Sequence, residues 1–296
     1  MQYLYSVCGI NVRLDIPFEI CIRRESEAFL TIGVGDTPAD IMMKFRPVMT
    51  LPDLSECEEN GHWEGDRLYI EKNDEQWIYH CLLKNKNPYA RVIWGHDFDS
   101  KRLILCNYRK ESETFMNYSH NLTSLIGLET LLLENSGLLL HASFIRWNGY
   151  GILFSAPSGT GKSTQADLWV KFRGAEIING DRAGIMKRLG KWTAYGLPVA
   201  GSSVIYRNEY AQIQGIIVLR QAPENHIRRL TMTEAFACLY SEIAVHSWHR
   251  PCVERVTELL TELISEVPVW QLKCLPDEEA VRLTERMLMS QTNLKV

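Results

Sequence analysis

Short apolar runs separated by polar turns dominate the first third of the chain, a pattern typical of β-strands. The stretch 53–66 is acidic and contains Gly61, which predicts a solvated loop. No catalytic motif occurs before residue 113, so we interpret 1–112 as a β-rich N-terminal region that serves substrate binding or assembly. The strands predicted in it are 3–7, 18–22, 29–32, 67–70, 76–83, 91–94 and 102–107.

From residue 113 onward the pattern switches between helical and strand periodicity. Leucines at helical spacing predict a helix over 115–135, and the apolar run that follows predicts a strand over 138–147. Asn148-Gly149 is a strong signal for a two-residue hairpin leading into another strand at 151–154. We therefore expect an α/β (α+β) domain over 113–296 with a mixed sheet. Its later predicted elements are a helix at 165–172 capped by Gly174, strands at 176–179, 183–187, 191–195, 214–219 and 269–273, and helices at 233–245, 252–265 and from 276 onward.

A phosphate-binding motif lies between the strand at 151–154 and the helix at 165–172. It has the spacing of a Walker A loop, with Ala156 in place of the usual first glycine. Gly159 and Gly161 allow successive backbone N–H groups to converge on one anion site. Lys162 can reach the outer phosphates, and the Ser163 hydroxyl can ligate Mg²⁺. We expect this loop to bind the phosphates of a nucleoside triphosphate through Ala156, Pro157, Ser158, Gly159, Thr160, Gly161, Lys162, Ser163 and Thr164.

Composition narrows the setting of this chemistry. The 296 residues carry a formal net charge of −4 and no long basic run, which argues against a general nucleic-acid binder. The eight cysteines are scattered without a C-x-x-C pair, and this favours free thiols in a reducing compartment. The N-terminus lacks the pattern of a signal peptide, and the apolar stretch 125–145 is interrupted by charged residues. We expect a cytoplasmic protein that does not enter a membrane.

Three motifs in order resemble the HPr serine kinase/phosphorylase family, which is itself similar to the ATP-dependent phosphoenolpyruvate carboxykinases. They are Leu140-His141-Ala142-Ser143 on the strand before the hairpin, the Gly-Lys-Ser loop, and Asn179-Gly180-Asp181-Arg182 after the loop's helix. The match covers about residues 138–220. The first 110 residues do not resemble the N-terminal domain of the bifunctional enzymes. The chain is more similar to smaller relatives that look like kinases of small molecules or of peptide and protein serines.

The resemblance implies roles for individual residues. Lys162 and the loop would hold ATP, and Ser163 with Asp181 would serve Mg²⁺. Asp181 matches the second Asp of the family's Asp-Asp-Arg element and would take the proton of the acceptor hydroxyl. Arg182 matches the arginine of that element, and His141 matches the histidine near the phosphates. Gly180 stands where the family has the first Asp. Relatives assemble, so the resemblance also allows a homo-oligomer.

Several alternatives stay open on the sequence. The missing carboxylate at Gly180 favours a non-catalytic ATP-binding sensor, and a carboxykinase-like enzyme is a further alternative. Arg207 could clamp a phosphate, although an ordinary solvated loop explains it equally well. The residues His246, His249 and Cys252 have the chemistry of zinc ligands, but no second ligand pair accompanies them.

Overall fold

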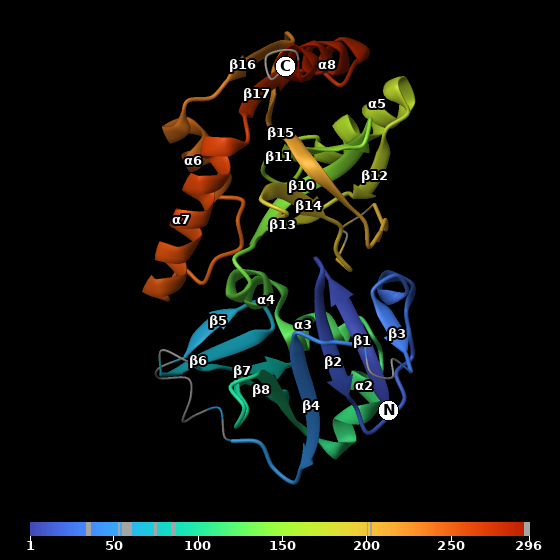
Figure 1. Cartoon of the computed structure of the whole chain (residues 1–296), viewed down its shortest axis with the longest axis vertical. Coiled ribbons are helices and arrows are strands. Elements are labelled where there is room, and N and C mark those ends of the chain that lie inside the picture. The colour runs from blue at the N-terminus through green and yellow to red at the C-terminus, as the bar shows by residue number, and fades with distance from the viewer. Residues whose placement is uncertain are drawn as a thin grey trace. The chain divides into compact units, whose positions relative to one another are not determined.

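The computed structural model describes residues 1–33, 37–52, 54, 61–73, 76–83, 87–199, 201 and 203–292. The fold is mixed α/β with two mixed sheets (Figure 1). The chain divides into two compact units, Met1–Leu128 and Glu129–Val296, which are described separately below. The boundary expected after residue 112 falls within the first unit, where the 3-10 helix η2 (Lys110–Ser112) meets α2 (Glu113–Met116).

The first unit is built on one twisted sheet. In its described residues the strand order is β3-β1-β2-β4-β9-β8-β7-β6-β5, with parallel pairing only at β2–β4 and β4–β9. The strands are β1 (Gln2–Val7), β2 (Ile10–Asp15), β3 (Leu30–Ile32), β4 (Ile41–Val48), β5 (His62–Glu64), β6 (Arg67–Asn73), β7 (Gln76–Leu82), β8 (Pro88–His96) and β9 (Arg102–Arg109).

Tyrosines anchor one face of this sheet to α3 (Asn121–Ile126). The Tyr79 hydroxyl donates to the carbonyl of Leu125 at 2.7 Å, and the Tyr5 hydroxyl lies 3.3 Å from Thr123 Oγ1. These rings are fully buried, so each phenol needs such a partner to avoid the cost of an unmade hydrogen bond. The β-rich character predicted from the strand pattern is therefore present in this unit.

Several predicted boundaries in this unit are wrong. Residues 18–22 form no strand, and Cys21 makes only an isolated bridge to Tyr118. Strands β2, β4 and β5 were not predicted, although β2 alternates cleanly between buried and less buried positions. The loop predicted over 53–66 contains β5, while residues 53 and 55–60 lie outside the described part of the chain. Short strands beside turns give too few positions for period-two patterning to stand out.

The single helix predicted over 115–135 is also wrong. The chain forms α2, α3 and α4 (Leu128–Glu134) instead, and α3 ends at Gly127. Gly127 has φ +72° in the left-handed region, which glycine adopts without the steric cost that other residues incur. The leucine pattern marked the buried side of two consecutive helices, and Gly127 marked the break between them.

The second unit carries a sheet that closes on itself. Its described strands run β11-β10-β13-β14-β15-β17-β16, β12 pairs with β10, and β11 also pairs with β15 in parallel. The pairings therefore form a ring through β11, β10, β13, β14 and β15. The strands are β10 (Leu138–Trp147), β11 (Tyr150–Ser155), β12 (Glu176–Asn179), β13 (Arg182–Arg188), β14 (Lys191–Tyr195), β15 (Tyr210–Gln221), β16 (His226–Arg229) and β17 (Val269–Cys274).

Helices enclose two apolar clusters around this sheet. One cluster joins α5 (Lys162–Arg173) and α8 (Glu278–Thr292) to β11 and β15 through residues such as Trp169 and Leu288. The other joins α6 (Met232–Tyr240) and α7 (Arg250–Glu266), which contact each other, to the opposite side of the sheet. Figure 1 shows α6 and α7 along one side of the unit. Large apolar side chains from both strands and helices fix the strands that carry the site below.

Most elements predicted in this unit are confirmed, with corrections at their ends. The hairpin at Asn148-Gly149 forms with antiparallel pairing of β10 and β11, and Gly174 caps α5 in the left-handed region. Strand β16 was not predicted. Thr231 and Glu234 form a capping box at the start of α6, which begins at Met232. The helix ends at Tyr240 and is therefore shorter than the predicted 233–245.

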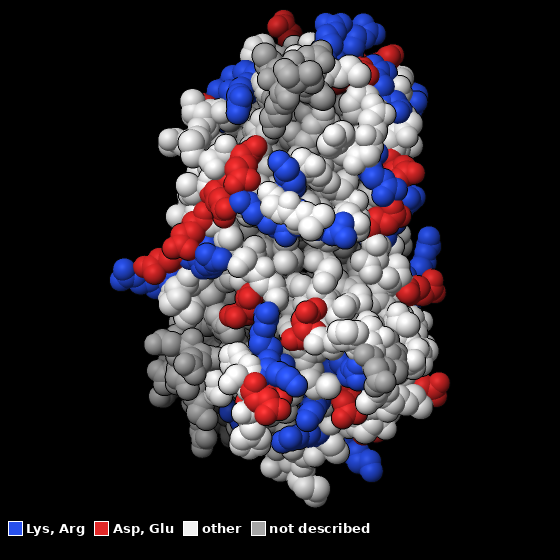
Figure 2. Space-filling model, in the orientation of Figure 1, with Lys and Arg blue, Asp and Glu red and all other residues white. Residues whose placement is uncertain are grey.

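A row of acidic side chains follows α7 on the face shown in Figure 2. The helix carries Glu254, Glu258, Glu262 and Glu266 at four-residue spacing. Each has a basic partner: Arg250 for Glu254, Arg255 for Glu258, and Lys187 for the last two. Exposed pairs of this kind contribute little to stability, and we assign the row no binding role.

Among the described residues, no helix has both the length and the apolar character needed to cross a bilayer. The seven cysteines within the described residues are free thiols, and Cys57 lies outside them.

Candidate functional site

The hairpin β10–β11 delivers the chain to the predicted phosphate loop. Its turn places Asn148 and Gly149 at φ +49° and +81°, the left-handed pair that a tight antiparallel turn requires. Ala142 on β10 lies opposite Ser155 at the end of β11, and the Ser155 hydroxyl donates to the carbonyl of His141 at 3.1 Å. The hairpin thus sets the position of His141 relative to the start of the loop.

Backbone conformation at two glycines shapes the loop itself. Gly159 and Gly161 have φ +79° and +112°, and Gly161 is the N-cap of α5. A Cβ at either position would meet nothing within 4 Å, so the requirement for glycine is conformational and not steric. Such a loop directs backbone N–H groups and the positive end of α5 toward the same point. The arrangement favours an anion at the start of α5.

Lys162 lies at the first position of α5 and folds back over the loop. Its Nζ donates to the carbonyl of Ala156 at 2.7 Å and to that of Pro157 at 3.3 Å. Burial lowers the pKa of this ammonium, while the carboxylates of Glu242 and Asp181 act in the opposite direction. The lysine is held by two carbonyls, which an anionic ligand in the loop could replace. Ser163 and Thr164, which follow it, are exposed.

A cavity of about 610 Å³ adjoins the loop. One wall is the loop, from Ala156 to Thr160, and a second is the end of β15. The Gln221 amide of β15 donates to the carbonyl of Gly159 at 3.5 Å, which links these two walls. The third wall comes from α6 and the residues after it: Ala237, Cys238, Ser241 and Glu242. The volume lies within the range of small-molecule and cofactor sites.

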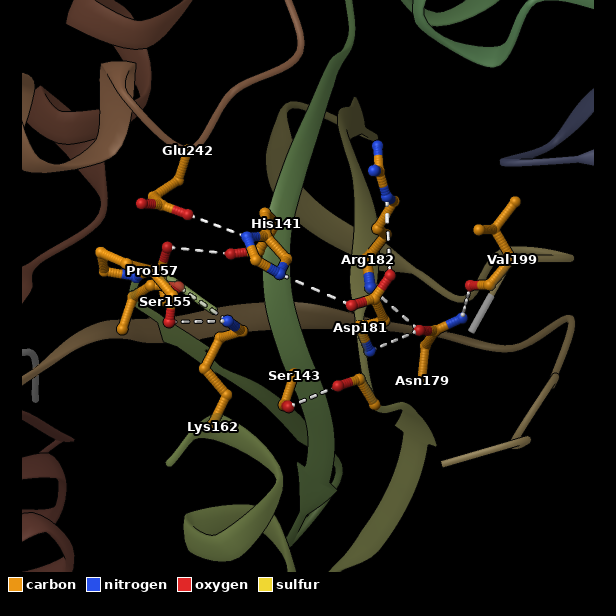
Figure 3. A network of polar contacts seen from close by, with 12 residues as sticks. His141, Ser143, Ser155, Pro157, Lys162, Asn179, Asp181, Arg182, Val199 and Glu242 are labelled. Atoms are coloured by element: carbon orange, nitrogen blue, oxygen red, sulfur yellow. Dashed lines mark hydrogen bonds and ion pairs between the residues drawn. The ribbon is translucent and has the colours of Figure 1, made fainter. Parts of the chain in front are cut away.

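Figure 3 shows His141 on β10 between two carboxylates. Its Nδ1 lies 2.9 Å from Glu242 Oε2, and its Nε2 lies 3.5 Å from Asp181 Oδ1. The Glu242 side chain is only 10% exposed, whereas those of His141 and Asp181 are 26% and 28% exposed. Both ring nitrogens therefore face carboxylate oxygens.

The turn that carries Asp181 is held by Asn179. The Asn179 Oδ1 accepts from the backbone N–H groups of Asp181 and Arg182 at 2.9 and 3.0 Å. The carbonyl of Gly180 accepts from the Ser143 hydroxyl at 2.8 Å, which ties the turn to β10. Arg182 Nε lies 3.6 Å from Asp181 Oδ2. Asp181 is thus fixed in the turn between β12 and β13, two strand spacings (about 10 Å) from the loop.

The structure brings together most of the predicted site residues but not all of them. Lys162, His141, Asp181 and Arg182 belong to one continuous set of contacts. Arg207 instead lies 3.8 Å from Glu209, which also pairs with Arg146. The described contacts of Arg207 therefore place it in an ion cluster on the sheet and not at the loop.

The histidines considered for zinc have separate contacts. His246 Nε2 lies 3.1 Å from Thr130 Oγ1, and His249 Nδ1 lies 3.2 Å from Cys252 Sγ. These contacts do not bring the three candidate ligands to one point.

Sequence reasoning missed two members of the site. Glu242 lies just after α6. Its backbone pairs with β10: Leu140 forms a β-bridge with Ile243, and the His141 N–H donates to the carbonyl of Glu242 at 2.9 Å. This pairing brings the Glu242 side chain to His141. That long-range pairing leaves no local signal. Asn179, by contrast, stands beside Asp181 in sequence, and an Asn that ends a strand before a turn is a recognisable signal for side-chain capping of that turn.

The oxygen donors around the loop fit a hard cation. Ser163 offers an exposed hydroxyl at the start of α5, and Asp181 offers a partly exposed carboxylate in the turn between β12 and β13. One hydroxyl and one carboxylate, completed by phosphate oxygens and water, is a donor set that suits Mg²⁺.

Residues 104–274 match the model of the family described as SynChlorMet cassette protein ScmC. This match covers more than half of the 296 residues. The chain belongs to the ScmC family. A search of curated proteins gives no match.

Among solved structures, the Hpr(Ser) kinase/phosphatase from Coxiella burnetii is similar at 14% sequence identity and a TM-score of 0.31. The alignment covers 53% of this chain and 91% of that one. A likeness at this level carries no argument about function, so the proposal below stands on the residues of this site.

Proposed function

We propose that this ScmC-family protein is an ATP- and Mg²⁺-dependent kinase that phosphorylates a hydroxyl of a small metabolite, a peptide or a protein serine. One observation carries the proposal: Lys162, at the start of the helix that follows the two left-handed glycines, lies within electrostatic reach of Asp181, which also contacts His141. We infer that a transferring phosphoryl group would lie between this loop and the partly exposed carboxylate of Asp181.

The loop and Lys162 supply binding and charge neutralisation. Backbone N–H groups at the start of α5 would hold the β- and γ-phosphates, and Lys162 would exchange its two carbonyl partners for phosphate oxygens. Ser163 and Asp181 would hold Mg²⁺, which neutralises charge on the phosphates. The adjoining cavity has the size to take the rest of the nucleotide.

Asp181 would act on the acceptor. The acceptor oxygen forms a bond to the γ-phosphorus while the bond between that phosphorus and the β–γ bridging oxygen breaks, and the acceptor proton passes to the Asp181 carboxylate. His141, held by Glu242, would present its Nε2 proton to the same region and orient Asp181. Little other covalent work is required of the protein, because positioning and electrostatics supply most of the rate in phosphoryl transfer.

The test is a transfer assay with γ-labelled ATP and Mg²⁺. The purified protein is incubated with an extract of its own cells, split into small-molecule and protein fractions, beside a Lys162→Ala control. We expect one fraction to be labelled by the wild type and not by Lys162→Ala. The substitution removes the positive charge that would neutralise the transferring phosphoryl group. Equal labelling by the wild type and Lys162→Ala would reject the proposal.

A second candidate is a non-catalytic ATP sensor, favoured by Gly180, which leaves Asp181 as the carboxylate of this turn. It predicts ATP binding that depends on Lys162, with no transfer to any fraction of the extract. Calorimetry on the same two proteins tests the ATP binding that both candidates require, and the transfer assay separates them.

A further inference from the structure

Gly180 faces the side chain of Ser203. A Cβ built on Gly180 would lie 2.3 Å from Ser203 Oγ and 2.5 Å from Ser203 Cβ, far inside van der Waals contact. The space that a side chain at position 180 would need is therefore filled by this serine. Gly201 also lies close to this turn, since a Cβ on it would lie 3.1 Å from Asp181 Oδ1. Gly201 and Ser203 thus pack directly on the Gly180–Asp181 turn.

The flanking residues hold Ser203 in this place. Asn179 Nδ2 donates to the carbonyls of Leu197 and Val199 at 3.0 and 2.7 Å, and Asn179 also bridges Tyr206. Val204 has φ +51°, a left-handed conformation that is strained for a β-branched residue. Strain of this kind persists only where surrounding contacts impose it, and it is concentrated at functional sites.

The hydroxyl of Ser203 has no hydrogen bond to explain its position. Its Oγ is buried, and no partner for it is found among the described residues. A buried hydroxyl without a partner is unfavourable, and rotation about the Cα–Cβ bond of Ser203 would break no described contact. The hydroxyl is therefore held beside Gly180, the residue before Asp181, by packing of the backbone and not by a described hydrogen bond of its own.

The strand order around the turn is compatible with Ser203 as a phosphoryl acceptor. In-line transfer requires the attacking oxygen to approach from the side opposite the phosphate loop. The phosphate loop follows β11, and β11 pairs with β10, which carries His141. On its other side, β10 pairs with β13, which begins directly after Asp181. Ser203 lies on the far side of that order, against the turn.

We propose that Ser203 is a site of self-phosphorylation by the same chain. This inference rests on the proposed kinase function. Ser203 Oγ forms a bond to the γ-phosphorus of ATP, the bond from that phosphorus to the β–γ bridging oxygen breaks to release ADP, and the hydroxyl proton passes to Asp181. The phosphoserine would place a dianion beside Gly180, where the unmodified protein has a neutral side chain.

The test is intact-mass measurement and peptide mapping of the full chain after incubation with ATP and Mg²⁺. We expect a mass increase of one phosphoryl group, located on Ser203, in the wild type and in the neighbouring control Ser202→Ala. The increase should be lost in Ser203→Ala and in Lys162→Ala. Mixing wild-type protein with excess Lys162→Ala should leave the variant unmodified, because the buried hydroxyl reacts within its own chain.

Failure of this inference is distinguishable from failure of the kinase proposal. Lys162-dependent transfer to another acceptor, without modification of Ser203, would overturn the inference alone. Lys162-dependent ATP binding with no transfer to any acceptor would overturn both and favour the sensor. Modification of Ser202 in place of Ser203 would also overturn it. Absence of any Lys162-dependent ATP binding would overturn both.

Thermal unfolding gives a readout that does not depend on activity. Ser203→Ala keeps the Cβ packing and removes only the unpartnered hydroxyl, so its melting temperature should equal or exceed that of the wild type. A clear fall in melting temperature would show that the hydroxyl is structurally bonded, and would contradict the inference.

Discussion

The two units differ in how they hold certain ionisable side chains. In the first unit, Tyr5, Cys8, His80 and Cys106 are buried. Burial raises the pKa values of Tyr5, Cys8 and Cys106 well above their ordinary values, so all three are neutral at pH 7. Burial, aided by the nearby Arg91, lowers the pKa of His80 to about 4. These groups act as core residues.

In the second unit the ionisable groups of the candidate site are partnered, and one of them, Glu242, lines the cavity. His141 lies between the carboxylates of Glu242 and Asp181. Both carboxylates also interact electrostatically with the ammonium of Lys162. We interpret pairing beside the predicted phosphate loop, and not the number of titratable residues, as the mark of a candidate site.

Asp181→Asn should have the largest effect. The amide keeps the size of the side chain but cannot take a proton, so transfer should fall by about 100- to 10,000-fold. ATP affinity should change much less, because the loop and Lys162 supply most phosphate contacts. Steady-state kinetics with calorimetric ATP binding checks both parts. Near-wild-type transfer by this variant would remove Asp181 from the mechanism.

His80 should make the stability of the first unit depend on pH. Between its ordinary pKa of about 6.5 and its folded pKa of about 4, the unfolded chain binds a proton that the folded chain does not. The free energy of unfolding should therefore fall as the pH drops through this range, by up to about 3 kcal/mol. Above pH 6.5 the group adds no pH dependence.

Denaturant titrations from pH 7 to pH 4 measure this effect. His80→Gln should flatten the acid limb, while the exposed control His226→Gln should leave it as it is. Parallel acid limbs for the wild type and His80→Gln would contradict the assignment.

Gly180→Ala tests the packing of the turn that carries Asp181. The added Cβ would collide with Ser203, and overpacking of this kind costs about 1–3 kcal/mol of unfolding free energy. Ser203→Gly should recover most of the loss in the double variant. A double-mutant cycle with chemical denaturation measures the coupling, and additive effects would show that the two residues do not touch.

Glu242→Gln should have a smaller effect. The substitution weakens the hydrogen bond that holds His141. Losing about 1.5 kcal/mol, typical of a hydrogen bond to a charged group, would lower kcat about tenfold if the whole loss falls on the transition state. The matched control is Glu254→Gln, which removes only an exposed pair with Arg250. If both variants reduce kcat equally, Glu242 has no special role.

The sequence predicted much of the second unit because its signals are local. The Asn148-Gly149 turn, the glycines of the loop and Gly174 each have a backbone reason to be where they are, and the structure confirms those conformations. The role of Glu242 could not be predicted, because Glu242 and His141 are 101 positions apart in the sequence. Likewise, nothing in the sequence shows that Ser203 fills the space beside Gly180.

The first unit was harder for a related physical reason. Its parallel pairs β2–β4 and β4–β9 join segments far apart in the chain, and such pairings leave no turn signature. Its helix pattern concealed the break at Gly127. Strand content could be predicted, but strand order could not.

The central claim is that the loop from Ala156 to Thr164 binds the phosphates of ATP. Its most direct test is calorimetric titration of the full chain with ATP and with AMP, both in the presence of Mg²⁺, beside Lys162→Ala. The account predicts that ATP binds the wild type, that AMP binds far more weakly, and that Lys162→Ala loses the preference for ATP. Equal affinity for ATP and AMP, or an unchanged preference in Lys162→Ala, would contradict it.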